Sequence, residues 1–427
     1  TNAQERTIHE IRDDLCSGRT MNRLLQGDVG SGKTVVAVWS LLAAVANGYQ
    51  GALLAPTEVL ARQHLQTVGE FARDMARVGF LSGSQSANDK RMTLRQLAEG
   101  SIDILVGTHA MLEPDVDWAR LGMVVTDEQH RFGVRQRLRL SYDSDAPHML
   151  VMSATPIPRS LAITLFGDLD LSVIDELPHG RKLVRTQVIE ERLRHLAYER
   201  VRQELAMGNQ AYVVCPLIRE GKSGRRSAQE VFEELKTGYL RGARIGLAHG
   251  DMPRDKLAEQ MQDFVEGKTQ VLVATTVIEV GVDVKNATCM VIEGAESFGL
   301  ATLHQLRGRV GRGEKQSYCF MISSGESGES AARLKALEKL HDGFSVAELD
   351  LLERGPGQFF GLKQHGVSEI NIQDLGVTED ILYAARHEAK PLVEAFEQGD
   401  RPPLQLSPLL SKVNARFGNL LMHARSR

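Results

Sequence analysis

Short apolar runs alternate with stretches of helical spacing along most of the chain. In the first part, buried strands are expected at 53–55, 102–106, 123–125 and 150–152. After a linker at 178–181, a second series is expected at 211–215, 244–247, 271–274, 290–293 and 317–322. Short apolar runs of this kind are typical of buried strands, and their alternation with helices predicts parallel sheets with helices on both faces. The pattern therefore predicts two domains of the same α/β class.

The pattern changes after residue 330. Apolar residues follow helical spacing on both sides of an Asp342-Gly343 turn, at positions 334, 337, 340, 346, 349 and 352. This spacing predicts a helical hairpin over 331–352. The hairpin leads into the glycine-rich segment Arg354-Gly355-Pro356-Gly357.

The clearest chemical signal is the segment 27–34, GDVGSGKT, which matches the phosphate-loop pattern GxxxxGK[ST] and precedes a helix-compatible run. Its glycines let the backbone wrap closely around phosphates, and the following helix N-terminus favours negative charge. Lys33 is expected to reach the terminal phosphates, and the Thr34 hydroxyl to hold Mg²⁺. The residues predicted to bind ATP here are Gly27, Asp28, Gly30, Ser31, Gly32, Lys33 and Thr34.

A second signal is the apolar strand 123–125, which runs through Thr126 into adjacent carboxylates at Asp127 and Glu128. Asp127 is placed to bind Mg²⁺. Glu128 is expected to orient and activate the attacking water, as a general base does. The alternative interpretation is a solvated acidic turn, which the phosphate loop upstream disfavours.

A third signal is the segment 305–312, QLRGRVGR, in the second predicted domain. It could be a basic surface cluster. The sharper hypothesis is that Arg309 and Arg312 are arginine fingers, which stabilise transition-state charge and contribute about 10³–10⁵ in rate. Fingers that reach across a cleft would make hydrolysis depend on domain closure, and so convert chemistry into motion.

The order of these motifs resembles that of superfamily 2 helicases, from about Gln4 to Arg312. Further segments carry this resemblance: 55–58 (APTE), 106–110 (VGTHA), 153–155 (SAT) and 271–284. The resemblance implies that Asp283 contacts the nucleotide and that Gln4 contacts adenine. It also implies that a set of loop residues contacts nucleic acid or couples it to the ATP site: Pro56, Thr57, Thr108, His109, Ser153, Thr155 and Thr275.

Longer matches resemble the RecG family of bacterial DNA translocases, which remodel stalled replication forks. They are the segments 127–134 (DEQHRFGV), 154–159 (ATPIPR), 173–181 and 304–313 (HQLRGRVGRG). The hairpin with Arg354 and Gln364 resembles the translocation motif that this family shares with the transcription-repair coupling factor. This resemblance implies that ATP-driven movement is passed to a loop that grips duplex DNA.

The resemblance also implies the domain plan and the partners. It gives two RecA-like P-loop NTPase domains in tandem, at 1–180 and 181–328, followed by the hairpin, translocation motif and extension at 329–427. The expected activity is that of an ATP- and Mg²⁺-dependent DNA helicase or translocase. Its expected partners are duplex, fork or Holliday-junction DNA, with single-strand-binding protein as a further candidate, and the expected state is a monomer.

Members of this family carry an N-terminal wedge domain that splits the fork junction. This chain starts at the motor and departs from the family there. It is either a fragment or a motor that works with a separate subunit, and fork specificity is the property this puts in doubt. Three alternative hypotheses concern the function of the chain. They are a coupling-factor-like duplex translocase that pushes another protein, a nucleotide-gated binding module with a vestigial ATPase, and an RNA helicase of the DEAD-box kind.

Composition places only a few limits on the function and location of the protein. Hydrophobic residues make up 42% and charged residues 25% of the chain, and the formal net charge of -4 neither indicates nor excludes a nucleic-acid partner. The four cysteines form no CxxC motif, which argues against a zinc site or a disulfide framework. With no apolar run long enough for a membrane span and a polar N-terminus, a cytoplasmic protein is expected. The resemblance to RecG implies a bacterial one.

Two weaker signals remain open. An arginine cluster follows the acidic segment and is either a solvated helix face or a DNA or domain contact: Arg131, Arg135, Arg137 and Arg139. Four histidines near the motifs lack metal-ligand spacing, which favours coupling or DNA contact over metal binding: His109, His130, His249 and His304. Aromatic residues make up only 5% of the chain, so base stacking is poorly supported.

Overall fold

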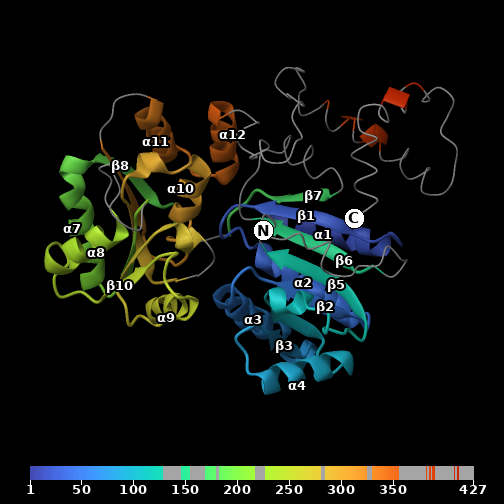
Figure 1. The fold of residues 1–427 in the computed structure, drawn as a ribbon. Coiled ribbons are helices and arrows are strands. Elements are labelled where there is room, and N and C mark those ends of the chain that lie inside the picture. The colour runs from blue at the N-terminus through green and yellow to red at the C-terminus, as the bar shows by residue number, and fades with distance from the viewer. Residues whose placement is uncertain are drawn as a thin grey trace. The chain divides into compact units, whose positions relative to one another are not determined.

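A computed structural model describes residues 1–127, 146–153, 169–178, 182–216, 227–279, 284–324 and 329–354, with a few isolated positions between 381 and 412. The chain divides into two compact units. One consists of Thr1–Pro158 and Asp168–Gly361, and the other of Arg159–Gly167 and Leu362–Arg427. The first unit contains two parallel sheets, each flanked by helices (Figure 1).

The first sheet has seven strands in the order β3-β4-β2-β5-β6-β1-β7, and every neighbouring pair is parallel. Its strands are β1 (Asn22–Gly27), β2 (Gln50–Leu54), β3 (Val78–Leu81), β4 (Ile104–Gly107), β5 (Leu121–Asp127), β6 (His148–Ser153) and β7 (Asp170–Ile174). The central strands β2 and β4 are buried along their whole length, as expected for a sheet covered on both faces.

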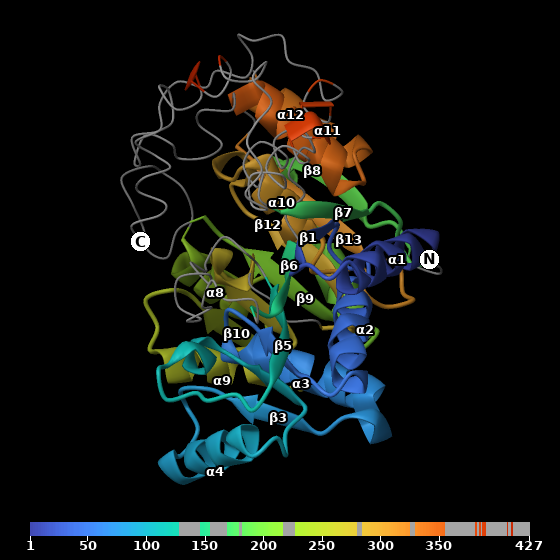
Figure 2. The same ribbon diagram turned by 90° about the vertical axis from the view of Figure 1, so that its right-hand side faces the viewer.

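The helices of this domain pack on the sheet through apolar stripes. They are α1 (Asn2–Cys16), α2 (Lys33–Ala46), α3 (Glu58–Ala72) and α4 (Ala87–Ala98), with 3₁₀ turns η1 (Arg73–Met75) and η2 (His109–Leu112). Ile11 of α1, Val36 of α2 and Val68 of α3 share one core with Leu53 and Val125 of the sheet. Figure 2 shows α1 and α2 beside each other. This packing fixes the start of α2 against the end of β1.

The second sheet has six strands in the order β10-β11-β9-β12-β13-β8, again all parallel. Its strands are β8 (Arg185–Glu190), β9 (Gln210–Val214), β10 (Ile245–Ala248), β11 (Val271–Ala274), β12 (Ala287–Ile292) and β13 (Tyr318–Ser323). The connecting elements are α7 (Arg194–Ala206), α8 (Ala228–Thr237), α9 (Arg254–Val265), α10 (Leu300–Arg307), and the 3₁₀ turns η4 (Glu191–Leu193), η5 (Thr276–Glu279) and η6 (Ala295–Ser297).

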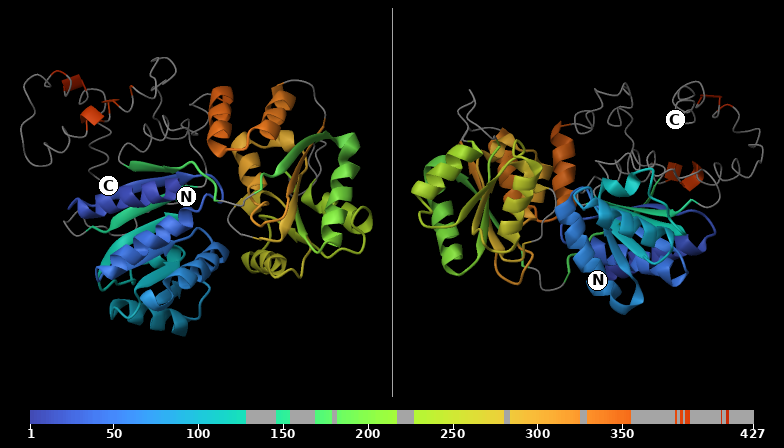
Figure 3. Two further views of the ribbon diagram at one scale, coloured as in Figure 1. Left: turned by 180° about the vertical axis from the view of Figure 1, so that it is seen from behind. Right: turned by 60° about the horizontal axis from the view of Figure 1, so that its bottom comes forward.

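Alternate residues of this sheet face two separate cores, because successive side chains of a strand point to opposite faces. Ala211 and Val213 of β9 lie in the core that α7 and α8 cover. Tyr212 and Val214 lie in the core that α9 and α10 cover. Figure 3 shows these helices on the two faces of the sheet.

The predicted hairpin is confirmed. Its helices are α11 (Glu329–Lys339) and α12 (Gly343–Arg354), on either side of the expected turn. The Ser345 backbone N–H donates to Asp342 Oδ1 at 2.8 Å, so Asp342 caps the N-terminus of α12. Leu337 and Val346 are buried in the same core as α10, which anchors the hairpin to the second sheet.

The predicted two-sheet α/β class is confirmed, and each expected strand overlaps an observed one. The expected linker at 178–181 lies mostly outside the described residues, so the domain division at 180 and 328 stays a prediction. Among the described residues, no helix is both long and apolar enough to cross a bilayer.

Candidate nucleotide-binding site

The predicted phosphate loop connects the end of β1 to the start of α2. Two of its glycines have left-handed backbone conformations, with φ of 75° at Gly30 and 86° at Gly32. A Cβ atom at Gly32 would also lie 2.1 Å from the Gln4 Nε2 atom. The left-handed backbone conformation at position 32 therefore favours glycine, and any side chain there would displace the Gln4 amide.

Lys33, the first residue of α2, is buried and folds back over the loop. Its Nζ atom donates to the Gly27 and Asp28 carbonyl oxygens, each at 2.8 Å. Beside it, the buried Ser31 Oγ atom has no hydrogen-bond partner in the described part of the chain. No side chain within that part caps the N-terminus of α2. Backbone N–H groups and an unpaired hydroxyl around a lysine fit a bound phosphate.

Gln4 lies directly over this loop, because its Nε2 atom donates to the Ser31 carbonyl oxygen at 3.2 Å. The third residue of α1 is thus held at the loop by a contact across 27 positions of sequence. Its predicted contact with adenine is compatible with this position and stays a prediction.

Asp127 is the last residue of β5, as expected, and its carboxylate accepts a hydrogen bond from His64 Nε2 at 2.8 Å. Burial raises the pKa of Asp127, but the His64 hydrogen bond and the nearby Lys33 and Arg309 charges together lower it by more. The pKa therefore lies below its ordinary value. The carboxylate is therefore ionised at neutral pH. Sequence reasoning missed His64, because a histidine on an amphipathic helix carries no distinguishing spacing.

One cavity of about 310 Å³ collects the predicted catalytic groups. Its lining includes Lys33 and Thr34 from the loop and Asp127 from β5. Arg309 and Arg312, which follow α10 of the second sheet, line it as well. Arg312 Nε donates to the Gly308 carbonyl oxygen at 3.1 Å, which holds its side chain at the helix end. The structure thus brings together residues from both sheets that are more than 170 positions apart in sequence.

The cavity suits a metal-bound polyphosphate. One lysine, two arginines and a helix N-terminus make it cationic, which favours phosphate groups. The Thr34 hydroxyl and the Asp127 carboxylate offer the oxygen ligands that Mg²⁺ prefers. Glu128 and Asp283, the other residues predicted to act here, lie outside the described residues.

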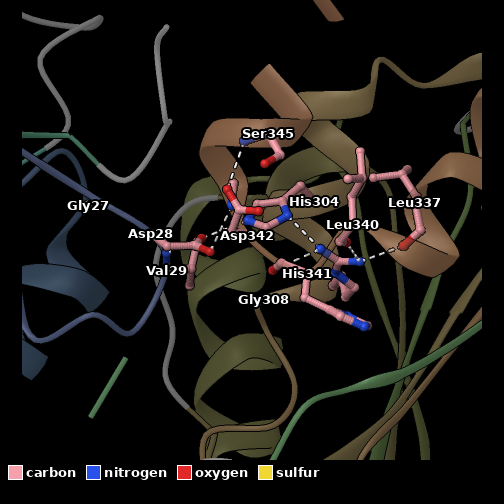
Figure 4. Close-up of polar contacts among 12 residues, drawn as sticks. Gly27, Asp28, Val29, His304, Gly308, Leu337, Leu340, His341, Asp342 and Ser345 are labelled. Carbon is pink, nitrogen blue, oxygen red and sulfur yellow. Dashed lines mark hydrogen bonds and ion pairs between the residues drawn. The ribbon is translucent and has the colours of Figure 1, made fainter. Parts of the chain in front are cut away.

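The side chain of Asp28 belongs to a different environment. It is absent from the lining of that cavity and instead accepts hydrogen bonds from His304 of α10 and from the Gly343 backbone of α12, as Figure 4 shows. Its neighbour Val29 packs against Gly308, where a Cβ atom would lie 2.8 Å from Val29 Cβ. The Asp28 carbonyl contacts Lys33, while the Asp28 carboxylate contacts the second domain.

Three family models match successive parts of the chain. The model described as DEAD/DEAH box helicase matches residues 1–164, and that described as helicase conserved C-terminal domain matches residues 191–314. The third, described as ATP-dependent DNA helicase RecG, domain 3, C-terminal, matches residues 340–409. Together they follow the order of the two sheets and the hairpin.

Relatives described as ATP-dependent DNA helicase RecG match nearly the whole chain. The protein of Synechocystis sp. is 47% identical over 424 residues, which are 99% of this chain and 50% of that protein. The Bacillus subtilis protein is 47% identical over 395 residues, with 92% of this chain and 58% of the relative covered. Along nearly its whole length, the chain is similar to RecG proteins. It spans about half the length of the curated relatives it matches.

Solved structures agree with this assignment. A structure described as RecG bound to a three-way DNA junction is 44% identical and superposes with a TM-score of 0.76, covering 90% of this chain and 49% of that one. Yeast Dbp5 is 19% identical with a TM-score of 0.54, and this likeness extends to the fold alone. The resemblance to RecG and the tandem RecA-like fold are thus confirmed.

The residues expected to contact nucleic acid lie after the carboxyl ends of strands, where parallel sheets bind ligands. Thr57 caps α3, with its Oγ1 accepting the Leu60 N–H at 3.4 Å. Thr108 precedes η2, which begins at His109, and Pro56 lies between β2 and α3. Ser153 ends β6 and Thr275 follows β11, both largely buried. Thr155, Gln364 and the side chain of Arg354 lie outside the described residues.

Proposed function

We propose that this chain is an ATP-driven motor that moves along duplex DNA and remodels branched DNA such as forks and recombination intermediates. The observation that carries the proposal is the cavity in which Lys33, Asp127 and the arginines after α10 meet. Two sheets that contribute to one nucleotide site can change their separation during a hydrolysis cycle. Similarity to RecG proteins, one of them solved with a three-way DNA junction, supports DNA as the track.

Each residue of the cavity has a role in this proposal. Lys33 leaves the Gly27 and Asp28 carbonyl oxygens to contact the terminal phosphates. Arg309 and Arg312 stabilise the charge that develops during phosphoryl transfer. Thr34 and Asp127 hold Mg²⁺, which neutralises phosphate charge when bound, and His64 keeps the Asp127 carboxylate in place. Glu128 positions and deprotonates the attacking water.

The DNA contact is proposed at the carboxyl ends of the strands. Thr57, Thr108 and Thr275 are hydroxyl-bearing residues after β2, β4 and β11, and hydroxyl and backbone N–H groups contact phosphate oxygens without reading sequence. Residues from both sheets in this set allow the grip on DNA to change as the sheets move. We further propose that the chain acts as a monomer on duplex, fork or Holliday-junction DNA.

The test is the steady-state ATPase rate under five conditions: without nucleic acid, and with single-stranded DNA, duplex DNA, a synthetic fork or RNA. Each is measured at two salt concentrations. The proposal expects strong stimulation by duplex or fork DNA that weakens with salt, because neutralising phosphates releases counterions. A rate at background with every DNA, repeated after a wedge domain from a RecG relative is added, would contradict it.

A strand-displacement assay on the same fork extends the test. Stimulated hydrolysis with displacement of a fork strand supports remodelling of branched DNA. Stimulation by duplex DNA without displacement would favour a translocase that acts on another protein. Stronger stimulation by RNA than by any DNA would favour an RNA helicase.

A further inference from the structure

A chain of polar contacts runs from the phosphate loop to the hairpin, through groups that do not line the nucleotide cavity. It starts at Asp28, whose Oδ1 atom lies 2.6 Å from His304 Nε2. His304 Nδ1 lies 2.8 Å from Arg307 Nη2. Arg307 Nη1 in turn donates to the Leu337 and Leu340 carbonyl oxygens, each at 2.8 Å. Leu337 lies in the last turn of α11 and Leu340 just after it, so the chain of contacts reaches the hairpin turn (Figure 4).

The direction of each hydrogen bond in this chain follows from chemistry. A guanidinium group only donates, so His304 Nδ1 must accept from Arg307 and carries no hydrogen. The hydrogen of the neutral ring therefore sits on Nε2, which donates to the Asp28 carboxylate. Arg307 thus sets the tautomer that lets His304 hold Asp28. Both His304 and Arg307 are almost fully buried, which excludes competing water.

A second contact reaches the hairpin directly. The Gly343 backbone N–H, at the start of α12, donates to Asp28 Oδ2 at 3.1 Å. The first N–H groups of a helix have no partner within the helix, and the positive end of its dipole favours a carboxylate. The two oxygens of one Asp28 carboxylate therefore hold α10 and α12 separately.

The electrostatics agree with a carboxylate that stays ionised in this position. Burial raises the pKa of Asp28, but the hydrogen bonds from His304 and the Val29 backbone, with the nearby Lys33 charge, lower it below its ordinary value. On the other side, the Asp28 carbonyl oxygen accepts from Lys33 Nζ at 2.8 Å. Asp28 is thus bonded to the phosphate-contacting lysine through its backbone and to the hairpin through its side chain.

We propose that Asp28 is a positioning residue that couples the phosphate loop to the α11–α12 hairpin. A change at Lys33 is passed through Asp28 to the start of α12, independently of Arg309 and Arg312. This inference rests on the proposed ATP-driven motor and adds a direct connection between its nucleotide site and the element before the predicted translocation motif. It also assigns the Asp28 side chain to coupling instead of nucleotide contact.

Gly343 offers a clean way to break this connection. Proline is well tolerated at the first position of a helix but has no N–H, so Gly343→Pro keeps α12 and removes the donor to Asp28. Gly343→Ala is the matched control, because it adds a side chain and keeps the N–H. A difference between these two variants isolates the single hydrogen bond. Circular dichroism and urea unfolding establish that both variants fold.

The first readout needs no DNA. The dissociation constant of a fluorescent ADP is measured for wild type, Gly343→Ala and Gly343→Pro. Coupling is reciprocal, so a hairpin that senses the loop also affects the loop. Releasing one anchor makes the loop less preorganised, and we expect Gly343→Pro to bind about three- to tenfold more weakly than Gly343→Ala. Equal dissociation constants for the two variants would overturn the proposal.

The second readout measures coupling with DNA present. The number of third strands displaced from a triplex per ATP hydrolysed is expected to fall at least about threefold in Gly343→Pro relative to Gly343→Ala. A merely structural defect lowers displacement and hydrolysis together and leaves their ratio unchanged. An unchanged ratio, like an unchanged dissociation constant, would count against Asp28 as a coupling residue.

A double-mutant cycle identifies the partner. If Gly343 acts through Asp28, then Asp28→Asn and Gly343→Pro combined weaken ADP binding no more than the stronger single variant does. Additive effects would place the Gly343 effect elsewhere and overturn the assignment. Asp103→Asn, which removes a carboxylate paired with Arg77 at the start of β4, is the control and leaves ADP affinity unchanged.

Failure of the motor proposal is distinguishable from failure of this inference. Wild-type chain that binds no fluorescent ADP would overturn both. Wild-type chain that binds ADP but shows no DNA-stimulated ATPase would contradict the motor alone, and the ADP comparison of the two Gly343 variants would still decide the role of Asp28.

Discussion

The two sheets have the same strand order and different chemistry. When strands are numbered from the first strand of each domain, β10-β11-β9-β12-β13-β8 becomes 3-4-2-5-6-1, which is the order of the first sheet without its edge strand β7. In the first domain, β1 leads into the glycine-rich loop before α2. In the second, β8 leads into Glu191–Leu193 and α7, without a glycine. Shared topology therefore does not make a nucleotide site.

A basic residue starts the helix after the first strand in both domains. Lys33 begins α2, and Arg194 begins α7. An acidic residue also stands at the end of the corresponding strand, Asp127 in β5 and Glu293 just after β12. In the second domain these two groups bond each other, with Arg194 Nε 2.7 Å from Glu293 Oε1. In the first domain both groups line the nucleotide cavity, where Lys33 bonds backbone carbonyl oxygens and Asp127 bonds His64.

The second pair is enclosed by further partners. Arg194 also bonds Glu234 at 2.6 Å, and the Tyr198 hydroxyl donates to Glu293. Burial lowers the pKa of Arg194, but Tyr198, Glu234 and Glu293 raise it well above its ordinary value. The same pair of charges thus has a structural role in one domain and a proposed catalytic role in the other. What distinguishes the two settings is the glycine-rich loop, which precedes Lys33 and has no counterpart before Arg194.

The largest expected effect is on Lys33. Lys33→Ala removes the group that contacts the terminal phosphates and should abolish measurable ATP hydrolysis and weaken nucleotide binding. Turnover in the presence of duplex DNA and the affinity for a fluorescent ADP are the measurements. Near-normal turnover would show that the first domain is not the nucleotide site and that the comparison with Arg194 is wrong.

Arg312 tests what the second domain supplies. Arg312→Ala should lower kcat by about a thousandfold while leaving ATP affinity largely intact, because an arginine finger acts on transition-state charge. Pre-steady-state and steady-state ATPase assays separate the two quantities. Arg244→Ala is a control in the same domain, because Arg244 is exposed and contacts only backbone and amide groups near Gly267 and Lys268 in the described structure. An unchanged kcat in Arg312→Ala would remove the finger assignment.

Replacing Arg194 should lower the stability of the fold, whereas replacing Lys33 should lower the ATPase activity. Arg194→Met leaves Glu293 buried without its charge partner, which should cost about 3–5 kcal/mol of unfolding free energy. Adding Glu293→Gln should recover part of this loss, since it removes the unpaired charge. Urea unfolding measures both variants. A loss in Arg194→Met as small as that in Lys33→Met would contradict the structural role of this pair.

Acid should reveal the Asp28 contact. Its folded-state pKa lies below the unfolded value of about 3.9, so ionised Asp28 stabilises the fold above about pH 3.9, and this contribution is lost as pH falls through the folded-state pKa. Asp28→Asn should therefore be about 1–3 kcal/mol less stable than wild type at neutral pH. The gap should narrow under acid conditions in urea unfolding at several pH values. A gap independent of pH would mean that charge is not involved.

The smallest expected effect is the difference in thiol labelling among the four cysteines, all of which lie in the part of the chain that the structure describes. Cys16 on α1 is exposed, while Cys215, Cys289 and Cys319 are buried in the second sheet. Burial raises the pKa of Cys319 to about 12, which keeps its thiol protonated and inert. A thiol reagent should label one group in the folded chain and the others only when the second sheet opens. Labelling of all four at one rate would contradict the buried core of that sheet.

The apolar runs predicted every interior strand except β1 and missed three of the four edge strands. β2, β4 and β5 are apolar runs because neighbours cover them on both sides. β3, β7 and β8 lie at sheet edges, and β8 alternates between exposed and partly buried residues. Edge strands need no continuous apolar run, and the hydrophobic pattern found only β10 among the four of them.

Sequence likewise predicted some residues of the candidate site and missed some of its contacts. The phosphate loop and Asp127 were predictable, because phosphate and Mg²⁺ binding require particular residues at fixed spacing. The contacts of His64 with Asp127 and of Asp28 with His304 were not predictable, because they join distant segments through ordinary residue types. Asp28 even occupies a position where the loop pattern allows any residue.

Gly308 lies where the phosphate loop closely approaches the end of α10. Its missing methyl group lets Val29 approach to where a Cβ atom would lie 2.8 Å away, so the absence of a side chain sets how near the loop and the end of α10 can come. Arg309 and Arg312 follow directly in sequence, so any residue with a side chain at position 308 would hold both arginines back from the phosphates. The reach of the two arginines, which are proposed to act in catalysis, thus depends on the absence of a side chain at position 308.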